Sequence, residues 1–188
     1  METLVSRAKS VLFEPRTTFK AVDTEFTKPG EIWSKYIIPL AAIGPIAGAV
    51  GRFIFGKRIA GQTIGQTVDL TGAITYAVIS FVLALVAVLV LSKIISLLAP
   101  QFGGQRNDVQ ALKAAAYAST PAWIGGIFNL LGLFLLLQII VSLYGLYLLH
   151  VGLPILMKVP QDRAMGYTAV VIIGAIVIFL LESTYVLF

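Results

Sequence analysis

The feature that most constrains this chain is a series of long apolar segments. A helix needs about 20 apolar residues to cross the hydrocarbon core of a bilayer, and four segments exceed or approach that length while a fifth comes close. The whole chain is 58% hydrophobic and 12% charged, whereas a soluble domain carries about 25% charged residues. We therefore predict an all-α, polytopic membrane protein with a five-helix transmembrane bundle. Its spans are expected at about residues 36–55, 70–99, 108–131, 134–157 and 167–188.

Residues 1–35 are predicted to form a cytoplasmic amphipathic helix and a juxtamembrane arm, ahead of a transmembrane domain over residues 36–188. The helix is expected over Met1 to Phe13 and is ended by Glu14 and Pro15. A short basic amphipathic helix typically lies among the lipid headgroups, so we expect an interfacial helix. Its apolar face consists of Leu4, Val5, Ala8, Val11 and Leu12.

Lys and Arg are distributed unevenly between the two sides of the predicted bundle. The side with the amino terminus holds Arg7, Lys9, Arg16, Lys20, Lys28, Lys35, Lys93, Arg106, Lys113, Lys158 and Arg163. The other side holds only Arg52, Lys57 and Arg58. Because loops rich in Lys and Arg stay in the cytoplasm, five spans place the amino terminus in the cytoplasm and the carboxyl terminus outside.

Small residues recur along the third predicted span at steps of three and four. This spacing places them on one stripe of a helix, and such a stripe lets neighbouring backbones approach closely in lipid. We predict that Ala118 and Gly125 touch the backbones of neighbouring spans, chiefly the second span, which offers Ala77, Ser80 and Ala84. The packing stripe consists of Ala111, Ala115, Ala118, Ala122 and Gly125.

Four polar residues within or beside the spans are the candidate functional positions. His150 is the only histidine, and we weigh a proton relay or ligand contact there against a neutral histidine bonded across helices. Glu182 is the only carboxylate within a span, and we weigh snorkelling to the outer interface against a buried coupling site. Asn129 and Gln138 flank the outer turn after the third span, where a hydrogen bond between them would hold helices together.

Several classes of chemistry lack the residues that they need. The chain has no cysteine and one histidine, which excludes disulfides and a histidine-cluster metal site. It contains neither H-E-x-x-H nor G-x-S-x-G, so we expect no enzyme activity and no cofactor. The repeat Gly61-Gln62-Thr63 and Gly65-Gln66-Thr67 has no preceding strand and no following lysine, unlike a phosphate-binding loop. The net charge of +5 reflects topology, and we expect no nucleic-acid partner.

Several motifs resemble the Yip1 membrane-domain family, and most closely its short bacterial inner-membrane branch. They are Glu14 to Phe19, Tyr117-Ala-Ser-Thr-Pro-Ala-Trp123, Tyr144-Gly-Leu-Tyr147 with Gly152, and Pro160 to Ala169. The resemblance implies a five-span bundle with a cytoplasmic amino terminus, located in a bacterial inner membrane. Eukaryotic members act in vesicle traffic and are linked to Rab GTPases; this sequence lacks their long cytosolic amino-terminal region, so the resemblance does not imply such a partner here.

Two functions fit these observations. The first is a non-enzymatic scaffold or adaptor whose partners are membrane lipids, other membrane proteins or a second copy of the chain. The second is a transporter or channel for a small solute, an ion or a lipid, whose folds commonly contain internal repeats with broken helices. A polar cavity at mid-membrane reaching Asn129, Gln138 or Ser142 would favour transport, and a dry, fully packed bundle would favour the scaffold.

Overall fold

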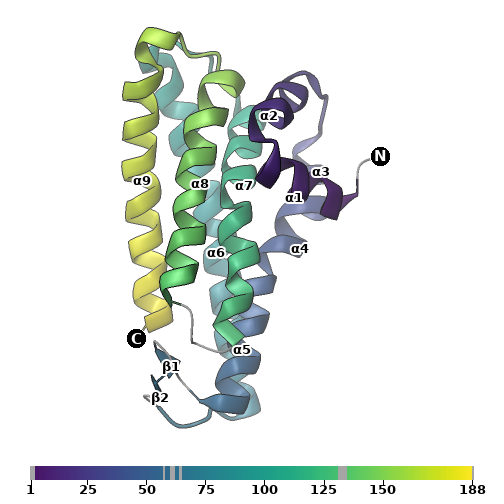
Figure 1. Ribbon diagram of the computed structural model, residues 1–188, viewed down its shortest axis with the longest axis vertical. Helices are drawn as coiled ribbons and strands as arrows, with labels where there is room; N and C mark the ends of the chain where they lie inside the picture. The colour runs from purple at the N-terminus through teal and green to yellow at the C-terminus, as the bar shows by residue number, and fades with distance from the viewer. Residues whose placement is uncertain (1–2, 57, 60–61, 64, 131–134, 188) are drawn as a thin grey trace.

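The computed structural model describes residues 3–56, 58–59, 62–63, 65–130 and 135–187. Long helices run side by side as a bundle, and short amino-terminal helices cover it near one end (Figure 1). A small antiparallel hairpin lies at the other end, which we call the hairpin end. The elements are α1 (Leu4–Phe13), α2 (Pro15–Thr24), α3 (Pro29–Ile32), a π-helical turn (Trp33–Ile37), α4 (Ile38–Ala41), α5 (Ile43–Phe55), β1 (Arg58–Ile59), β2 (Gln62–Thr63), α6 (Leu70–Leu98), a 3-10 turn (Ala99–Phe102), α7 (Asp108–Gly125), a 3-10 turn (Gly126–Leu130), α8 (Leu135–Leu156) and α9 (Gln161–Leu187).

Helix length and hydropathy make this a multi-pass membrane protein. Within the described residues, three helical stretches are long and apolar enough to cross a membrane: Pro29–Phe55, Leu70–Phe102 and Gln161–Glu182. Leu143–Leu156 forms a shorter apolar helix. The predicted count of five spans is therefore not confirmed; α7, in place of the third span, is not among the three long apolar stretches. It ends at Gly125 and continues as a 3-10 turn.

The modest hydropathy of α7 follows from its position among the other helices. Most of its residues are buried within the protein, including Lys113, Thr120 and Trp123. A helix that is covered by other helices does not need a fully apolar surface, because its side chains meet protein groups rather than lipid. Polar and small side chains are therefore tolerated in α7 that would be costly on a lipid-facing helix.

The alanine stripe of α7 packs most tightly against α8. A Cβ atom added to Gly145 of α8 would lie 2.5 Å from the carbonyl oxygen of Ala118, and one added to Gly125 would lie 3.0 Å from Cγ1 of Val141. For Ala118 and Gly125 the closest contacts are with α8 rather than with α6, the second span that the sequence favoured. The physical reason is Gly145, which lacks a side chain and allows α8 to approach the α7 backbone more closely.

The amino-terminal helices α1 and α2, which we call the N-terminal layer, pack on the bundle. Ala8 and Val11 of α1 are buried against protein, whereas Val5 is 62% exposed. The hydroxyl of Tyr144 on α8 donates a hydrogen bond to the carbonyl oxygen of Leu12 at 2.7 Å. Val11 of the predicted apolar face is therefore covered by the bundle, and only part of that face remains free.

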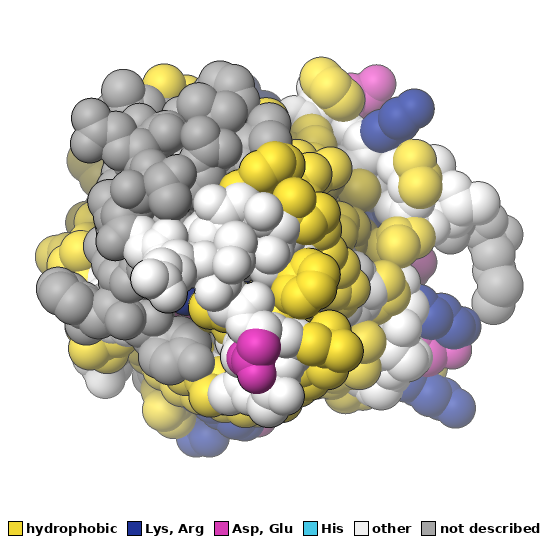
Figure 2. Space-filling model, turned by 90° about the horizontal axis from the view of Figure 1, so that it is seen from below, with side chains coloured by type: hydrophobic (Ala, Val, Ile, Leu, Met, Phe, Trp, Pro, Cys, Tyr) yellow, Lys and Arg dark blue, Asp and Glu magenta, His cyan; other side chains and the backbone are white. Residues whose placement is uncertain are grey.

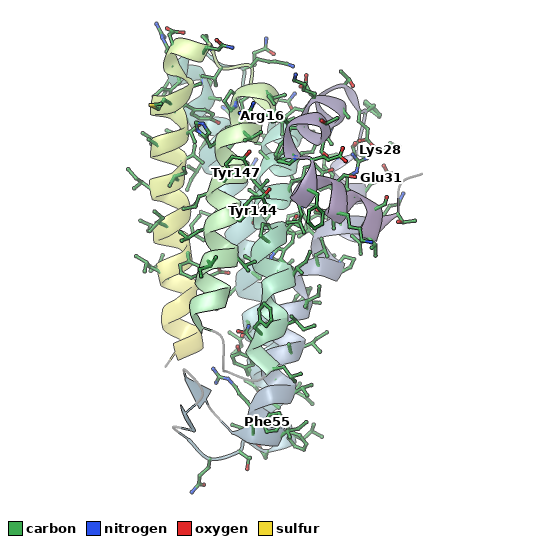
Figure 3. All side chains as sticks on the ribbon, viewed as in Figure 1. Arg16, Lys28, Glu31, Phe55, Tyr144 and Tyr147 are labelled. Atoms are coloured by element: carbon green, nitrogen blue, oxygen red, sulfur yellow. The ribbon has the colours of Figure 1, made fainter. Side chains whose placement is uncertain are left out.

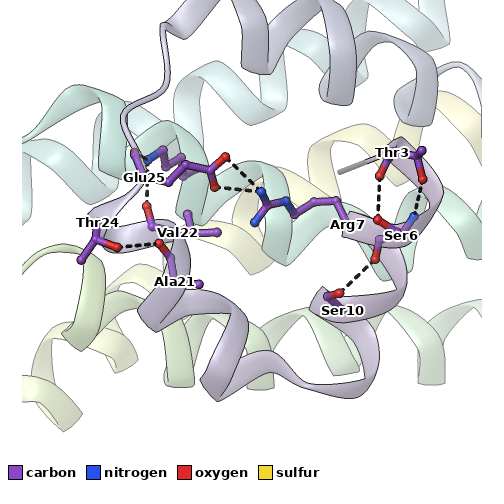
Figure 4. Close-up of polar contacts among 9 residues, drawn as sticks. Thr3, Ser6, Arg7, Ser10, Ala21, Val22, Thr24 and Glu25 are labelled. Carbon is purple, nitrogen blue, oxygen red and sulfur yellow. Dashed lines mark hydrogen bonds and ion pairs between the residues drawn. The ribbon is translucent and has the colours of Figure 1, made fainter. Parts of the chain in front are cut away.

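The segment predicted as a juxtamembrane arm is largely helical and contributes to the core. Phe19 and Val22 of α2 are fully buried, and Phe19 lies over Gly152 of α8, where an added Cβ would come within 2.6 Å of the ring. Figure 4 shows how α1 and α2 are joined, with Arg7 donating two hydrogen bonds to the Glu25 carboxylate at 2.8 and 3.0 Å. Lys28 and Glu31 lie at the outer edge of this region, far from Phe55 (Figure 3).

The carboxyl end of α2 is held by side chains from the bundle. Nζ of the buried Lys113 donates to the carbonyl oxygens of Val22 at 2.9 Å and Glu25 at 2.7 Å. Nε2 of Gln110 donates to the carbonyl oxygen of Asp23 at 2.9 Å, and Lys158 forms an ion pair with the Asp23 carboxylate. A helix ends with unsatisfied carbonyl groups and partial negative charge, so an ammonium group there is favourable.

Replacing Gly145 with leucine should destabilise the bundle. The new side chain would meet the Ala118 carbonyl, and overpacking of this kind costs about 1–3 kcal/mol. We expect a clearly lower midpoint of thermal unfolding in detergent for Gly145→Leu. Ile140→Leu on the same helix is the control, because Ile140 is 63% exposed and the change should leave the midpoint unaltered. Equal midpoints for the two variants would contradict the close packing of α7 on α8.

Replacing Lys113 with methionine should loosen the N-terminal layer. The change preserves much of the side-chain length but removes both hydrogen bonds to α2, and a bond from a charged group contributes about 1.5–3 kcal/mol. We expect the amides of α2 to exchange with deuterium about tenfold faster or more. Lys35→Met is the control, because its ammonium forms only an exposed pair with Glu31. Unchanged exchange in Lys113→Met would show that its two hydrogen bonds do not hold the layer in place.

Candidate interhelical site

A cavity of about 350 Å³ lies between the long helices. Binding sites for small molecules typically occupy about 300–1,000 Å³ and are mostly apolar with a few polar groups. Much of this wall consists of small and aliphatic side chains, with Ala84 and Ala87 from α6 and Ala118 and Ala122 from α7. The site is therefore a space between backbones that small residues leave open, and not a polar cleft.

Five polar side chains contribute to the cavity wall. They are Tyr76, Ser80, Ser119, Asn129 and Glu182. The Ser119 hydroxyl donates to the carbonyl oxygen of Ala115 at 2.9 Å, whereas Oγ of Ser80 is buried without a hydrogen-bond partner among the described residues. A buried hydroxyl without a partner costs free energy unless something else satisfies it. Ser80 therefore gives the cavity an unused hydrogen-bonding group.

Most of these polar groups lie toward the hairpin end. Tyr76 is six residues into α6, Asn129 belongs to the turn after α7, and Glu182 lies in the last turns of α9. Figure 1 shows that these helix ends are on the same side of the molecule as β1 and β2. Viewed from that side, hydrophobic side chains form a broad band and the charged side chains lie mainly at the periphery (Figure 2).

Tyr76 is held in place by contacts with α5. Its ring lies beside Gly48, where an added Cβ would come within 2.7 Å of a ring carbon. The guanidinium carbon of Arg52 lies 3.9 Å from the ring centroid, a cation–π contact. Glycine at position 48 thus makes room for the aromatic ring, and Arg52 lies over its face.

Aromatic side chains close the bundle toward the N-terminal layer. The hydroxyl groups of Tyr36 and Thr120 are hydrogen-bonded at 2.7 Å, and the rings of Tyr36 and Tyr117 pack edge to face with centroids 4.9 Å apart. Phe19 of α2 packs on Tyr117 at 6.2 Å. No residue of α1 or α2 lines the cavity. The N-terminal layer therefore does not contribute to the cavity wall.

The structure brings together two of the four candidate positions. Asn129 and Glu182 both line the cavity. His150 is exposed on α8 and does not line the cavity. The side chain of Gln138, and hence its predicted bond to Asn129, lies outside the described residues, as does the side chain of Ser142.

Sequence reasoning missed Tyr76 and Trp123 as wall residues of the cavity. Tyr76 had a detectable signal, because it is a large polar side chain six residues after the start of an apolar helix and can face the glycines of the preceding span. Trp123 had none, because a tryptophan in a membrane helix is equally compatible with a lipid-facing or an internal position.

The groups that line this cavity are suited to binding a molecule. Within the described residues no three metal-ligating side chains lie together. The wall offers apolar surface, one carboxylate, one amide and hydroxyl groups. These groups can bind an apolar or amphipathic molecule and form hydrogen bonds with its polar end.

Fold and cavity together define a multi-pass helical membrane protein with an interhelical binding pocket. The family model described as the Yip1 domain matches residues 9–182, and the chain belongs to this family. The Yip1 family consists generally of non-enzymatic membrane proteins. Comparisons with curated proteins and with solved structures gave no match.

Replacing Ser80 with alanine should leave stability unchanged or raise it. The buried hydroxyl has no protein partner in the described structure, so removing it relieves a desolvation cost. Thr120→Val is the matched comparison, because it leaves the buried Tyr36 hydroxyl without its partner, at a cost of about 1–3 kcal/mol. Thermal unfolding in lipid-free detergent measures both. An equal loss in the two variants would mean that Ser80 has a protein partner.

Proposed function

We propose that this protein is a non-enzymatic membrane scaffold of the Yip1 type that binds a lipid in its interhelical cavity. The observation that carries the proposal is the cavity itself, which has the size of a ligand site and is mainly apolar with polar groups at one end. From the sequence, a polar cavity would have favoured transport and a fully packed bundle the scaffold; the cavity reaches Asn129 but its wall is mainly apolar, so it meets neither expectation as stated. An apolar cavity within a membrane protein is adjacent to an abundant apolar ligand, the surrounding lipid.

The cavity wall continues onto the surface between α8 and α9. Leu143 of α8 and Ile176 and Phe179 of α9 line the cavity and are also 56%, 42% and 42% exposed. A lipid chain can therefore enter sideways from the membrane between these two helices. The polar head can remain near the bilayer surface at the hairpin end while the chain is inside.

The proposal includes a bundle of five crossings in a bacterial inner membrane, with the amino terminus in the cytoplasm and the carboxyl terminus outside. Support comes from the excess of Lys and Arg on the amino-terminal side and from the position of the two chain termini toward opposite ends of the molecule (Figure 1). In this arrangement α7 crosses as an internal helix shielded from lipid.

Protein partners would meet the cytoplasmic face of the N-terminal layer. Lys9, Arg16 and Lys20 are exposed there, together with Phe13 at 80% exposure. A surface with exposed cations and an aromatic side chain suits either anionic headgroups or an acidic protein segment. A second copy of the chain is a further candidate partner.

A carrier for a small amphipathic molecule is the second candidate function. Asn129 and Glu182 favour it, because polar residues inside a membrane domain commonly mark a substrate path. A carrier would have to open the cavity toward the N-terminal layer, the end of the bundle where Tyr36 and Thr120 are hydrogen-bonded. Movement of labelled lipid between leaflets of proteoliposomes, or its absence, distinguishes carrier from scaffold.

Filling the cavity should abolish lipid retention. Ala84 lines the cavity, and a phenylalanine there would occupy part of its volume. We expect native mass spectrometry to show a bound lipid on the unmodified protein and at least about a tenfold lower lipid-bound fraction for Ala84→Phe, a loss of roughly 1.4 kcal/mol or more. Val82→Phe on the same helix is the control, since Val82 is 50% exposed on the outer surface. Equal retention by both variants would place the lipid outside the cavity and refute the proposal.

A further inference from the structure

We infer that the cavity selects a phospholipid whose headgroup carries a primary ammonium, with one acyl chain inside and the ammonium at Glu182. This inference rests on the proposed lipid-binding function and goes beyond it by naming the class of lipid. It follows from the length of the cavity, from the distribution of polar groups along it, and from the one carboxylate in its wall.

The cavity is long and narrow. Its wall includes Tyr76 and Leu91, which are fifteen residues apart on α6 and hence about 22 Å apart along the helix axis at 1.5 Å per residue. A volume of about 350 Å³ extended along this length suits an extended chain and not a compact ring system. One leaflet of a bilayer has a hydrocarbon thickness of about 15 Å, so an acyl chain can reach most of the cavity.

The two ends of the cavity differ in polarity. Toward the N-terminal layer the wall consists of Val88 and Leu91 from α6 and Leu149 from α8. Toward the hairpin end it includes Asn129 and Glu182. An amphipathic molecule therefore has one favoured orientation, with its chain directed at the N-terminal layer and its headgroup at the hairpin end.

Glu182 determines which headgroup fits. It forms no ion pair with the described residues, and a half-buried carboxylate at a membrane span needs a donor or a counter-charge. A primary ammonium supplies a positive charge and three N–H donors, and the Asn129 amide and Ser80 hydroxyl oxygens can accept as well. A quaternary ammonium has no N–H donor, and an anionic headgroup would be repelled by the carboxylate.

Trp123 lines the cavity and provides a direct reporter. The chain has two tryptophans, so Trp33→Phe leaves Trp123 as the only one. This variant is reconstituted with phosphatidylethanolamine, phosphatidylcholine or phosphatidylglycerol carrying the same brominated chains, which quench tryptophan fluorescence on contact. We expect phosphatidylethanolamine to quench at about tenfold lower mole fraction than the other two, as one added charged hydrogen bond allows. Adding Glu182→Gln should remove this preference.

The outcomes separate the inference from the function on which it rests. Ala84→Phe in the same background should abolish the quenching and Val82→Phe should retain it, which assigns the signal to the cavity. If no lipid quenches Trp123 beyond the Ala84→Phe background, the proposed lipid-binding function itself fails. Equal quenching by all three headgroups, or strongest quenching by phosphatidylglycerol, would leave lipid binding intact and overturn the inference. The headgroup comparison decides this without any substitution at Glu182.

Discussion

The rest of the structure depends on the close approach of α7 to its neighbours. In lipid there is little hydrophobic force between helices, so their association relies on contact between closely packed surfaces. The carbonyl oxygen of Ala118 lies so near Gly145 that a Cβ there would be at 2.5 Å, and a Cβ on Gly126, in the 3-10 turn after α7, would lie 2.7 Å from Cα of Gly44 of α5. These two contacts join α7 to α8 and the turn that follows α7 to α5. Once α7 is internal, its lysine, threonine and tyrosine side chains can be satisfied by protein groups.

The N-terminal layer is held in part by a side chain of this internal helix. Lys113 would be costly on a lipid-facing surface, but from α7 its ammonium reaches two carbonyl groups at the end of α2. Phe19 fits over Gly152 only because that position lacks a side chain. The buried ammonium of Lys113 and the space that Gly152 leaves for Phe19 thus hold a polar amino-terminal segment on a membrane bundle.

The sequence was sufficient to predict a helical membrane protein, because long apolar segments leave few alternatives. It also predicted the starts of α6 and α7 within a residue or two. It was not sufficient to predict that α1 and α2 pack on the bundle. Val11 and Leu12 show the same periodicity whether a helix lies on lipid or on protein, since both surfaces are apolar. The partner of the alanine stripe was also beyond sequence reasoning, because α6 and α8 both offer small residues.

In the candidate site, Asn129 and Glu182 were identified as polar residues of the spans, but their convergence on one cavity depends on how the helices are arranged.

The same small residues that bring the helices together also explain why a cavity remains. Alanine permits close approach where it faces glycine, as Ala118 faces Gly145, but it cannot fill space where it faces another alanine across a wider gap. Ala84 and Ala87 of α6 line the same cavity as Ala118 and Ala122 of α7. Toward the N-terminal layer the cavity wall is apolar, with Val88 and Leu91, while polar side chains line the other end. A pocket that is apolar toward the N-terminal layer, polar toward the hairpin end and bordered by exposed residues of α8 and α9 has the geometry that the proposed lipid-binding site requires.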